Sequence, residues 1–93
     1  MRLRFTLEAL THIDAIGFYL AHRSPAAAAH IVGRIFADCD RLAEFPHLGH
    51  AGAVHDTFEW TVAGLPYIVV HEVNQGEGEV IILGVFHGAQ RRD

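Results

Sequence analysis

Residues 7–46, LEALTHIDAIGFYLAHRSPAAAAHIVGRIFADCDRLAEFP, contain the pattern that decides the fold. In the first half, apolar side chains recur at spacings of four, three and four, which predicts an amphipathic helix over roughly residues 7–22. This helix also contains Gly17, a residue that weakens a helix by about 1 kcal/mol relative to alanine. Its presence suggests that a second helix approaches closely there. The apolar stripe consists of Ala9, Ile13, Ile16 and Leu20.

A second helix should follow almost at once. Ser24 and Pro25 form a typical helix start, with a serine N-cap and a proline at the first helical position. The helix should end before Pro46, because the residue preceding a proline disfavours helical geometry. With two or three residues between them, the two helices should pack as an antiparallel hairpin. The second apolar stripe consists of Ala28, Ile31, Ile35, Cys39 and Leu42.

The remaining segments are predicted to be strands and loops. Residues 2–5 alternate between apolar and charged side chains, which is typical of a short strand with one buried face. Residues 46–56 contain proline, glycines and three histidines and should form a loop. Three further strands are expected over residues 57–62, 67–73 and 80–86. The chain is thus expected to be an α+β domain of order β-α-α-β-β-β, with a helical hairpin on one face of a small antiparallel sheet.

Composition limits the possible functions. The length of 93 residues predicts one domain over residues 1–93. No apolar run is long enough for a membrane span. The single cysteine, Cys39, cannot form an internal disulfide, so we expect a cytoplasmic protein. The formal net charge is −4, and this argues against nucleic-acid binding through general phosphate neutralisation. No cofactor is expected.

Several local sequences, in the same order and at suitable spacing, resemble the RelE/ParE family of toxins, and its ParE branch in particular. The helix junction Ser24-Pro25 followed by alanines is one of these. The others are similar to an L-x-x-x-P-x-x-G helix exit, a P-Y-x-[IV]-x-Y strand and a C-terminal V-x-H-x-x-[QR]-[DR] signature. They lie at residues 42–49, 66–70 and 85–91, and the first helix, over residues 9–20, also resembles that of ParE toxins.

The resemblance implies a toxin of a type II toxin–antitoxin system, a class that includes plasmid-stabilisation proteins and inhibits growth. Its expected partner is a ParD-like antitoxin with a ribbon-helix-helix domain, and operator DNA would be contacted only through that antitoxin. ParE members inhibit DNA gyrase by trapping it with cleaved DNA, whereas RelE members cut messenger RNA on the ribosome. Both activities share one fold, so the fold alone cannot choose between them.

The residues of the middle strands favour gyrase inhibition, which would make the protein an inhibitor and not an enzyme. RelE-like ribonucleases place arginines or lysines there to stabilise charge at the scissile phosphate. Here residues 58–60 and 66–69 contain no cation, and Glu59 adds a negative charge. His87 is a weak candidate for a catalytic group, because a histidine can transfer protons near neutral pH. The alternatives are a ribosome-dependent endoribonuclease and an inactive member that only binds antitoxin.

Two sets of residues are expected to form binding sites. His87, Arg91 and Arg92 would contact the poisoned target, because arginine is suited to bidentate contacts with carboxylate or phosphate. Arg91 and Arg92 could equally be a solvated chain end, and His87 could serve to order the tail. The antitoxin would contact Trp60, Tyr67, Ile13 and Leu20. The two aromatic residues among these could also serve in core packing.

The remaining histidines are given no binding role. His47, His50 and His55 lie close together in the loop, but the expected state is a solvated loop, so no metal site is predicted. His12 falls outside the apolar stripe of its helix and is therefore expected on the helix surface.

Overall fold

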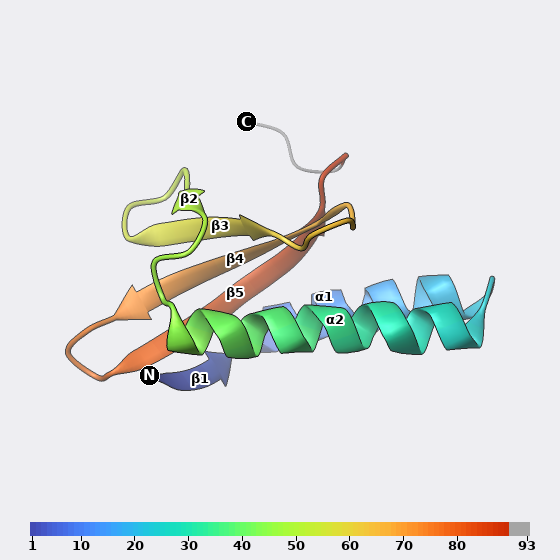
Figure 1. The fold of residues 1–93 in the computed structure, drawn as a ribbon, viewed down its shortest axis with the longest axis horizontal. Coiled ribbons are helices and arrows are strands. Elements are labelled where there is room, and N and C mark those ends of the chain that lie inside the picture. The colour runs from blue at the N-terminus through green and yellow to red at the C-terminus, as the bar shows by residue number, and fades with distance from the viewer. Residues whose placement is uncertain (90–93) are drawn as a thin grey trace.

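The computed structural model describes residues 1–89, which form two helices packed on one face of a five-stranded sheet (Figure 1). No helix in this part of the chain is both long enough and apolar enough to cross a membrane. The elements in chain order are β1 (Arg2–Phe5), α1 (Leu7–Ala21), α2 (Pro25–Glu44), β2 (His50–Ala51), β3 (Thr57–Thr61), β4 (Tyr67–Asn74) and β5 (Glu79–His87).

Capping side chains determine where both helices begin. The hydroxyl oxygen of Thr6 accepts a hydrogen bond from the backbone N–H of Ala9 at 3.1 Å, at the start of α1. The hydroxyl oxygen of Ser24 accepts one from the N–H of Ala27 at 3.1 Å, and Pro25 occupies the first turn of α2. Each cap satisfies a backbone donor that has no partner within its helix. The predicted helical hairpin is thus confirmed.

The sheet has the strand order β1-β5-β4-β3-β2 and is mixed. β5 pairs with β4 in antiparallel fashion, but β1 pairs with β5 in parallel, with Phe5 beside Ile82. The expectation of an α+β fold is confirmed, whereas the expectation of a purely antiparallel sheet is wrong. The alternation in residues 2–5 shows which side chains are buried. It does not show whether the neighbouring strand runs parallel or antiparallel. The short strand β2 is a second difference, because it lies in the segment that we expected to be only a loop.

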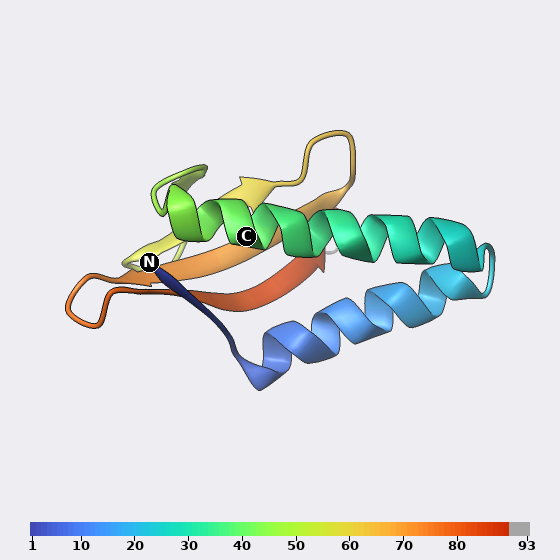
Figure 2. The same ribbon diagram turned by 60° about the horizontal axis from the view of Figure 1, so that its bottom comes forward.

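The core lies between the helices and one face of the sheet, and Figure 2 shows both helices on that same side. Cys39 is fully buried there. Burial raises the pKa of the Cys39 thiol to about 12, and the carboxylates of Asp38 and Asp40 add to the rise. Because the thiolate is the reactive form of cysteine, Cys39 is an inert packing residue. The largest fully buried apolar side chains are Ile13, Ile35, Leu42, Ile82, Val62, Val69 and Val80.

The two helices approach closely at Gly17. A Cβ atom at that position would lie 3.2 Å from Cγ2 of Val32, which is tighter than ordinary van der Waals contact. The close approach expected from this glycine is therefore confirmed. By contrast, a Cβ atom at Gly33 of α2 would have no heavy atom within 4 Å.

Candidate functional site

A pocket of about 700 Å³ lies between α1 and the last residues of β5. β1 ends opposite Ile82, so α1 takes the place of a neighbouring strand along the remainder of β5. The pocket brings together Tyr67 and His87, which the sequence assigned to two different binding sites. Its lining consists of His12, Ala15, Ile16, Tyr19, Tyr67, Val85, Phe86 and His87.

The ring of His87 is held by its neighbours. Its Nδ1 atom accepts a hydrogen bond from the backbone N–H of Ala89 at 3.0 Å. The ring also packs edge-to-face on Tyr67, with the centroids 5.6 Å apart. Since Nδ1 acts as an acceptor, the neutral ring carries its proton on Nε2. These contacts let His87 fix the start of the C-terminal segment, which is the alternative role that we considered for it.

His12 connects α1 to the edge of β5 through a hydrogen bond and a ring contact. Its Nδ1 atom accepts a hydrogen bond from the backbone N–H of Val85 at 3.2 Å, and its ring packs on Phe86 with centroids 4.8 Å apart. Gly84 makes room for this contact, because a Cβ atom there would lie 2.8 Å from the Phe86 ring and 3.0 Å from His12 Nδ1. The sequence did not reveal this role. The half-buried His12 lies beside the apolar stripe, and no local pattern shows that a strand edge passes there.

The two tyrosines add polar groups to a mostly apolar pocket. Burial raises the pKa of Tyr67 above its usual value of 10.0, and the nearby Tyr19 adds to the rise. The Tyr67 phenol therefore stays protonated at neutral pH and can donate a hydrogen bond. The guanidinium group of Arg23 lies over the Tyr19 ring at 5.0 Å from its centroid, an arrangement typical of a cation–π contact.

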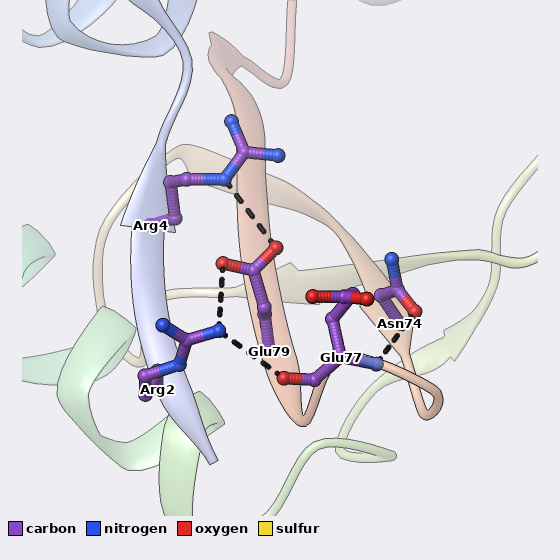
Figure 3. A network of polar contacts seen from close by, with 5 residues as sticks. All are labelled: Arg2, Arg4, Asn74, Glu77 and Glu79. Atoms are coloured by element: carbon purple, nitrogen blue, oxygen red, sulfur yellow. Dashed lines mark hydrogen bonds and ion pairs between the residues drawn. The ribbon is translucent and has the colours of Figure 1, made fainter.

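The N-terminal arginines lie away from this pocket, at the other end of β5 (Figure 3). The two carboxylate oxygens of Glu79 pair with Arg2 at 3.8 Å and with Arg4 at 3.5 Å. Arg2 also donates a hydrogen bond to the carbonyl oxygen of Glu77 at 3.2 Å. One carboxylate thus largely offsets the only local cluster of positive charge within residues 1–89.

A second depression lies across the two helices. Its volume is about 740 Å³, and it is flanked by large apolar side chains that the sequence analysis had not singled out. Phe18 is 71% exposed and Phe36 is 36% exposed. Both are aromatic residues outside the buried stripes, and that is the signal that could have identified them. The lining consists of Thr11, Ile13, Asp14, Ala15, Gly17, Phe18, Ala21, Val32 and Phe36.

The four residues expected to bind antitoxin do not form one surface. Ile13 is only 2% exposed and belongs to the core, although it also contributes to the lining of the groove across the helices. Trp60 is half-buried, and its indole N–H donates a hydrogen bond to Oδ2 of Asp38 at 2.9 Å. Leu20 is half-buried near the end of α1, and Tyr67 lines the pocket beside β5.

The histidines of the loop line neither of these two pockets. Arg91 and Arg92 lie outside the described residues. In the loop, His47 contacts the side chain of Gln75, His50 pairs with Glu59 at 3.6 Å, and His55 pairs with its neighbour Asp56. These contacts are of the kind expected in a solvated loop. Among residues 1–89, no group of three or more metal-ligating side chains is placed to hold an ion.

The fold is similar to that of known toxins of the RelE/ParE class. The toxin–antitoxin structure described as "Chromosomal ParDE TA system from P. aeruginosa" contains a chain that matches with a TM-score of 0.80 and 23% identity, over 94% of this chain and 95% of that chain. The isolated Escherichia coli RelE toxin matches with a TM-score of 0.72 and 15% identity, over 99% of this chain and 86% of that chain. These two similarities define the fold class.

The sequence comparisons identify the family itself. The family model described as "ParE toxin of type II toxin-antitoxin system, parDE" matches residues 3–92. A protein of Sinorhizobium fredii named "Putative toxin Y4kP" is 40% identical over 90 residues, which is 97% of this chain and 91% of that protein. The chain therefore belongs to the ParE toxin family of type II toxin–antitoxin systems. This confirms the family that the sequence motifs indicated.

Proposed function

We propose that the protein is a toxin that inhibits DNA gyrase by binding to it, and that an antitoxin neutralises it. Membership of the ParE family supports the choice of target. The observation that carries the proposal is the placement of the arginines in the described part of the chain. RNA cleavage requires cations around the scissile phosphate. Here Arg2 and Arg4 are paired with Glu79, and Arg34 donates a hydrogen bond to the carbonyl oxygen of Ala63.

The remaining described arginines fit the same interpretation. The guanidinium of Arg23 lies on the Tyr19 ring, and Arg41 is exposed in the last turn of α2. None of the arginines within residues 1–89 contacts His87 directly. A histidine without such companions can order a chain end, but it cannot by itself stabilise the charge that develops during phosphodiester cleavage.

The groove across α1 and α2 supports neutralisation by a protein partner. Exposed apolar patches on small proteins commonly mark interaction sites. An amphipathic helix can bury its apolar face in such a groove, with anchoring residues one helical turn apart. We propose that a ParD-like ribbon-helix-helix antitoxin covers Phe18 and Phe36 in this way, and that operator DNA is contacted only through the antitoxin.

The target is tested with the purified toxin in two parallel assays. We expect the toxin to block supercoiling by gyrase and to leave ribosome-bound messenger RNA intact. Cells that express it should show a DNA-damage response. Cleavage of messenger RNA at codons, with supercoiling unaffected, would refute gyrase inhibition.

A ribonuclease remains the second candidate because the pocket beside β5 gathers His12, Tyr19, Tyr67 and His87. Histidines are suited to proton transfer near neutral pH. If this alternative holds, His87→Ala should abolish RNA cleavage in the second assay. A protein that affects neither gyrase nor RNA, yet binds antitoxin, would instead be the inactive family member that we also considered.

A further inference from the structure

The groove across α1 and α2 is apolar except for one acidic side chain. Its lining includes two small residues of α1, Gly17 and Ala21, and the large rings of Phe18 and Phe36. Among the described residues that line the groove, Asp14 is the only one with a charged side chain. When a partner covers such a surface, the carboxylate loses hydration, and this is costly unless the partner supplies an opposite charge.

Asp14 does not stabilise the helix that carries it. It lies at the centre of α1, whereas an acidic side chain interacts favourably with the helix dipole only near the N-terminal end. That end is capped by the hydroxyl group of Thr6. Aspartate is also among the less favourable residues in the interior of a helix. The local structure of α1 therefore gives no reason for an aspartate at this position.

The Asp14 carboxylate forms no ion pair in the part of the chain that the structure describes. On a helix, a side chain interacts with those three and four positions away. For Asp14 these are Leu10, Thr11, Gly17 and Phe18, and none of them is basic. The side chain is exposed, so its charge is hydrated in the free protein.

Arginines close to the helical hairpin contact other groups. The guanidinium group of Arg23 lies over the Tyr19 ring at 5.0 Å from its centroid. Arg34 donates a hydrogen bond to the carbonyl oxygen of Ala63 at 2.7 Å. A cation brought by a partner can therefore pair with Asp14 without breaking an ion pair of the described chain.

The two aromatic rings of the groove are held in place by their neighbours. Phe36 packs edge-to-face on Phe5 with the centroids 5.4 Å apart, and Phe18 packs in the same way on His22 at 4.7 Å. The Nδ1–H of His22 donates a hydrogen bond to the carbonyl oxygen of Phe18 at 2.9 Å. Side chains that are already ordered lose little conformational freedom on binding. The rings can therefore serve as fixed apolar anchors beside Asp14.

We propose that the antitoxin helix covering this groove places an arginine or lysine against Asp14, and that this ion pair determines which antitoxins the protein accepts. The inference rests on the proposed function, because the antitoxin is the partner that it describes. Asp14 and Phe18 lie one helical turn apart on the same face of α1. The cation should therefore lie within about one helical turn of the apolar side chain that packs on Phe18.

A charge in an apolar groove favours one partner over related ones. An antitoxin with an apolar residue at this position would bury the carboxylate without a partner, and an acidic residue would add repulsion. Both mismatches weaken the wrong complex more than the ion pair strengthens the right one. The net charge of −4 acts in the same direction at longer range, because it attracts a basic segment.

Asp14→Leu tests the inference directly, because a cationic and an apolar occupant predict opposite results. Calorimetry measures binding to the antitoxin candidate encoded by the adjacent reading frame. If the antitoxin brings a cation, leucine leaves that cation without a partner, and affinity should fall about tenfold or more. If the antitoxin brings an apolar side chain, leucine adds apolar contact and affinity should rise. An unchanged or higher affinity would overturn the proposal.

A pair of charge reversals separates the local ion pair from the net charge. Asp14→Lys and Glu44→Lys each replace one negative charge with one positive charge. Glu44 is exposed at the end of α2, lines neither pocket, and lies about 12 Å along the helix from Phe36, at about 1.5 Å per residue. We expect Asp14→Lys to weaken binding by about a hundredfold and Glu44→Lys by about threefold or less. Similar losses in both variants would contradict the ion pair.

A compensating exchange in the antitoxin identifies the other half of the pair. Each basic residue of its amphipathic segment is replaced in turn by glutamate. One exchange should weaken binding to the parent protein and restore binding to Asp14→Lys, because contacting residues are energetically coupled. If every exchange acts equally on the parent and on Asp14→Lys, the proposal is wrong.

The outcomes separate this inference from the function on which it rests. A complex whose affinity is insensitive to Asp14 contradicts the ion pair and leaves neutralisation by an antitoxin intact. Failure of the parent protein to bind the antitoxin contradicts both. Circular dichroism checks the fold of each variant, which should be unchanged because Asp14 is exposed. If the leucine variant does not fold, Asp14→Asn, which removes the charge at nearly constant size, takes its place and should also weaken binding.

Discussion

His71 is a polar side chain in an apolar setting. It is fully buried, with its ring stacked on Phe58 at a centroid distance of 5.4 Å. Its Nε2–H donates a hydrogen bond to the carbonyl oxygen of Pro46 at 2.7 Å, whereas Nδ1 has no hydrogen-bond partner in the described residues. Burial lowers the pKa of His71 below its usual 6.5. The hydrogen bond to Pro46 raises the pKa and so partly opposes the effect of burial, whereas the nearby His47 lowers the pKa further.

This arrangement predicts that the protein loses stability in mild acid. Because the folded-state pKa of His71 is lowered, its contribution is complete above about pH 6.5 and is lost as the pH falls below that value. The loss should reach at most about 1.4 kcal/mol per pH unit. Urea unfolding of the parent and of His71→Gln between pH 7.5 and pH 5 measures it, because glutamine keeps a donor near Pro46 without titrating. Equal pH dependence in both proteins would contradict the prediction.

At the level of single residues, the sequence predicted burial better than it predicted contacts between distant residues. The stripe through Ile13 was correctly expected to be apolar and packed. Its neighbour His12 was assigned to the helix surface, although it bonds to the edge of β5. Helical periodicity reports which side of a helix is apolar. It does not report which strand passes beside a particular side chain.

At the level of elements, the sequence located both helices and four of the five strands. The N-cap Ser24 and the proline at position 46, just after the C-cap Phe45, are local signals, so the ends of α2 could be predicted closely. β2 could not be predicted, because two residues are too few to show an alternation. β1 is parallel to its neighbour because it pairs with residues 79–82, which lie far along the chain. A local sequence pattern cannot show the direction of such a distant partner.

The two glycines of the helical hairpin should respond in opposite ways to substitution. Gly33→Ala adds a methyl group in open space and should raise the free energy of unfolding by about 0.5–1 kcal/mol, because alanine favours the helix. Gly17→Val instead forces a branched side chain against Val32 and should lower it by about 1–3 kcal/mol. Chemical denaturation of both variants measures these changes. A stabilised Gly17→Val would show that the helices can move apart freely.

A substitution in the groove across the helices should weaken binding of the antitoxin without weakening the fold. Phe18 is 71% exposed, so Phe18→Ser should change the free energy of unfolding by less than about 0.5 kcal/mol. Antitoxin affinity should fall at least tenfold, because aromatic anchors supply much of the energy of such interfaces. Val54→Ser is the matched control, since Val54 is 68% exposed and lines neither pocket. Equal affinities for the two variants in calorimetry would remove the groove from the antitoxin interface.

At the level of the whole molecule, the distribution of positive charge can be tested for its effect on growth inhibition. The net charge is −4, and two of the seven basic residues, Arg91 and Arg92, lie at the C-terminal end. Replacing both with alanine should weaken growth inhibition, because arginine is suited to contacts with carboxylate or phosphate on the target. Antitoxin affinity should change by less than about tenfold, or roughly 1.4 kcal/mol.

The control for that test is Arg41→Ala, which removes an exposed charge from the end of α2. It should leave growth inhibition unchanged. If the double variant inhibits growth as strongly as the parent at equal protein levels, the two terminal arginines are only a solvated chain end.

The parallel pairing of β1 with β5 also determines when the sheet can be completed during synthesis. The ribosome delivers β1 first and β5 last, and β5 lies between β1 and β4 in the sheet. Pairing between segments so distant in the chain forms slowly, because the intervening chain must first be closed into a loop. The nascent protein therefore has helices but no complete sheet. We therefore expect a partner that binds the groove across α1 and α2 to be able to engage the new chain before the sheet is complete.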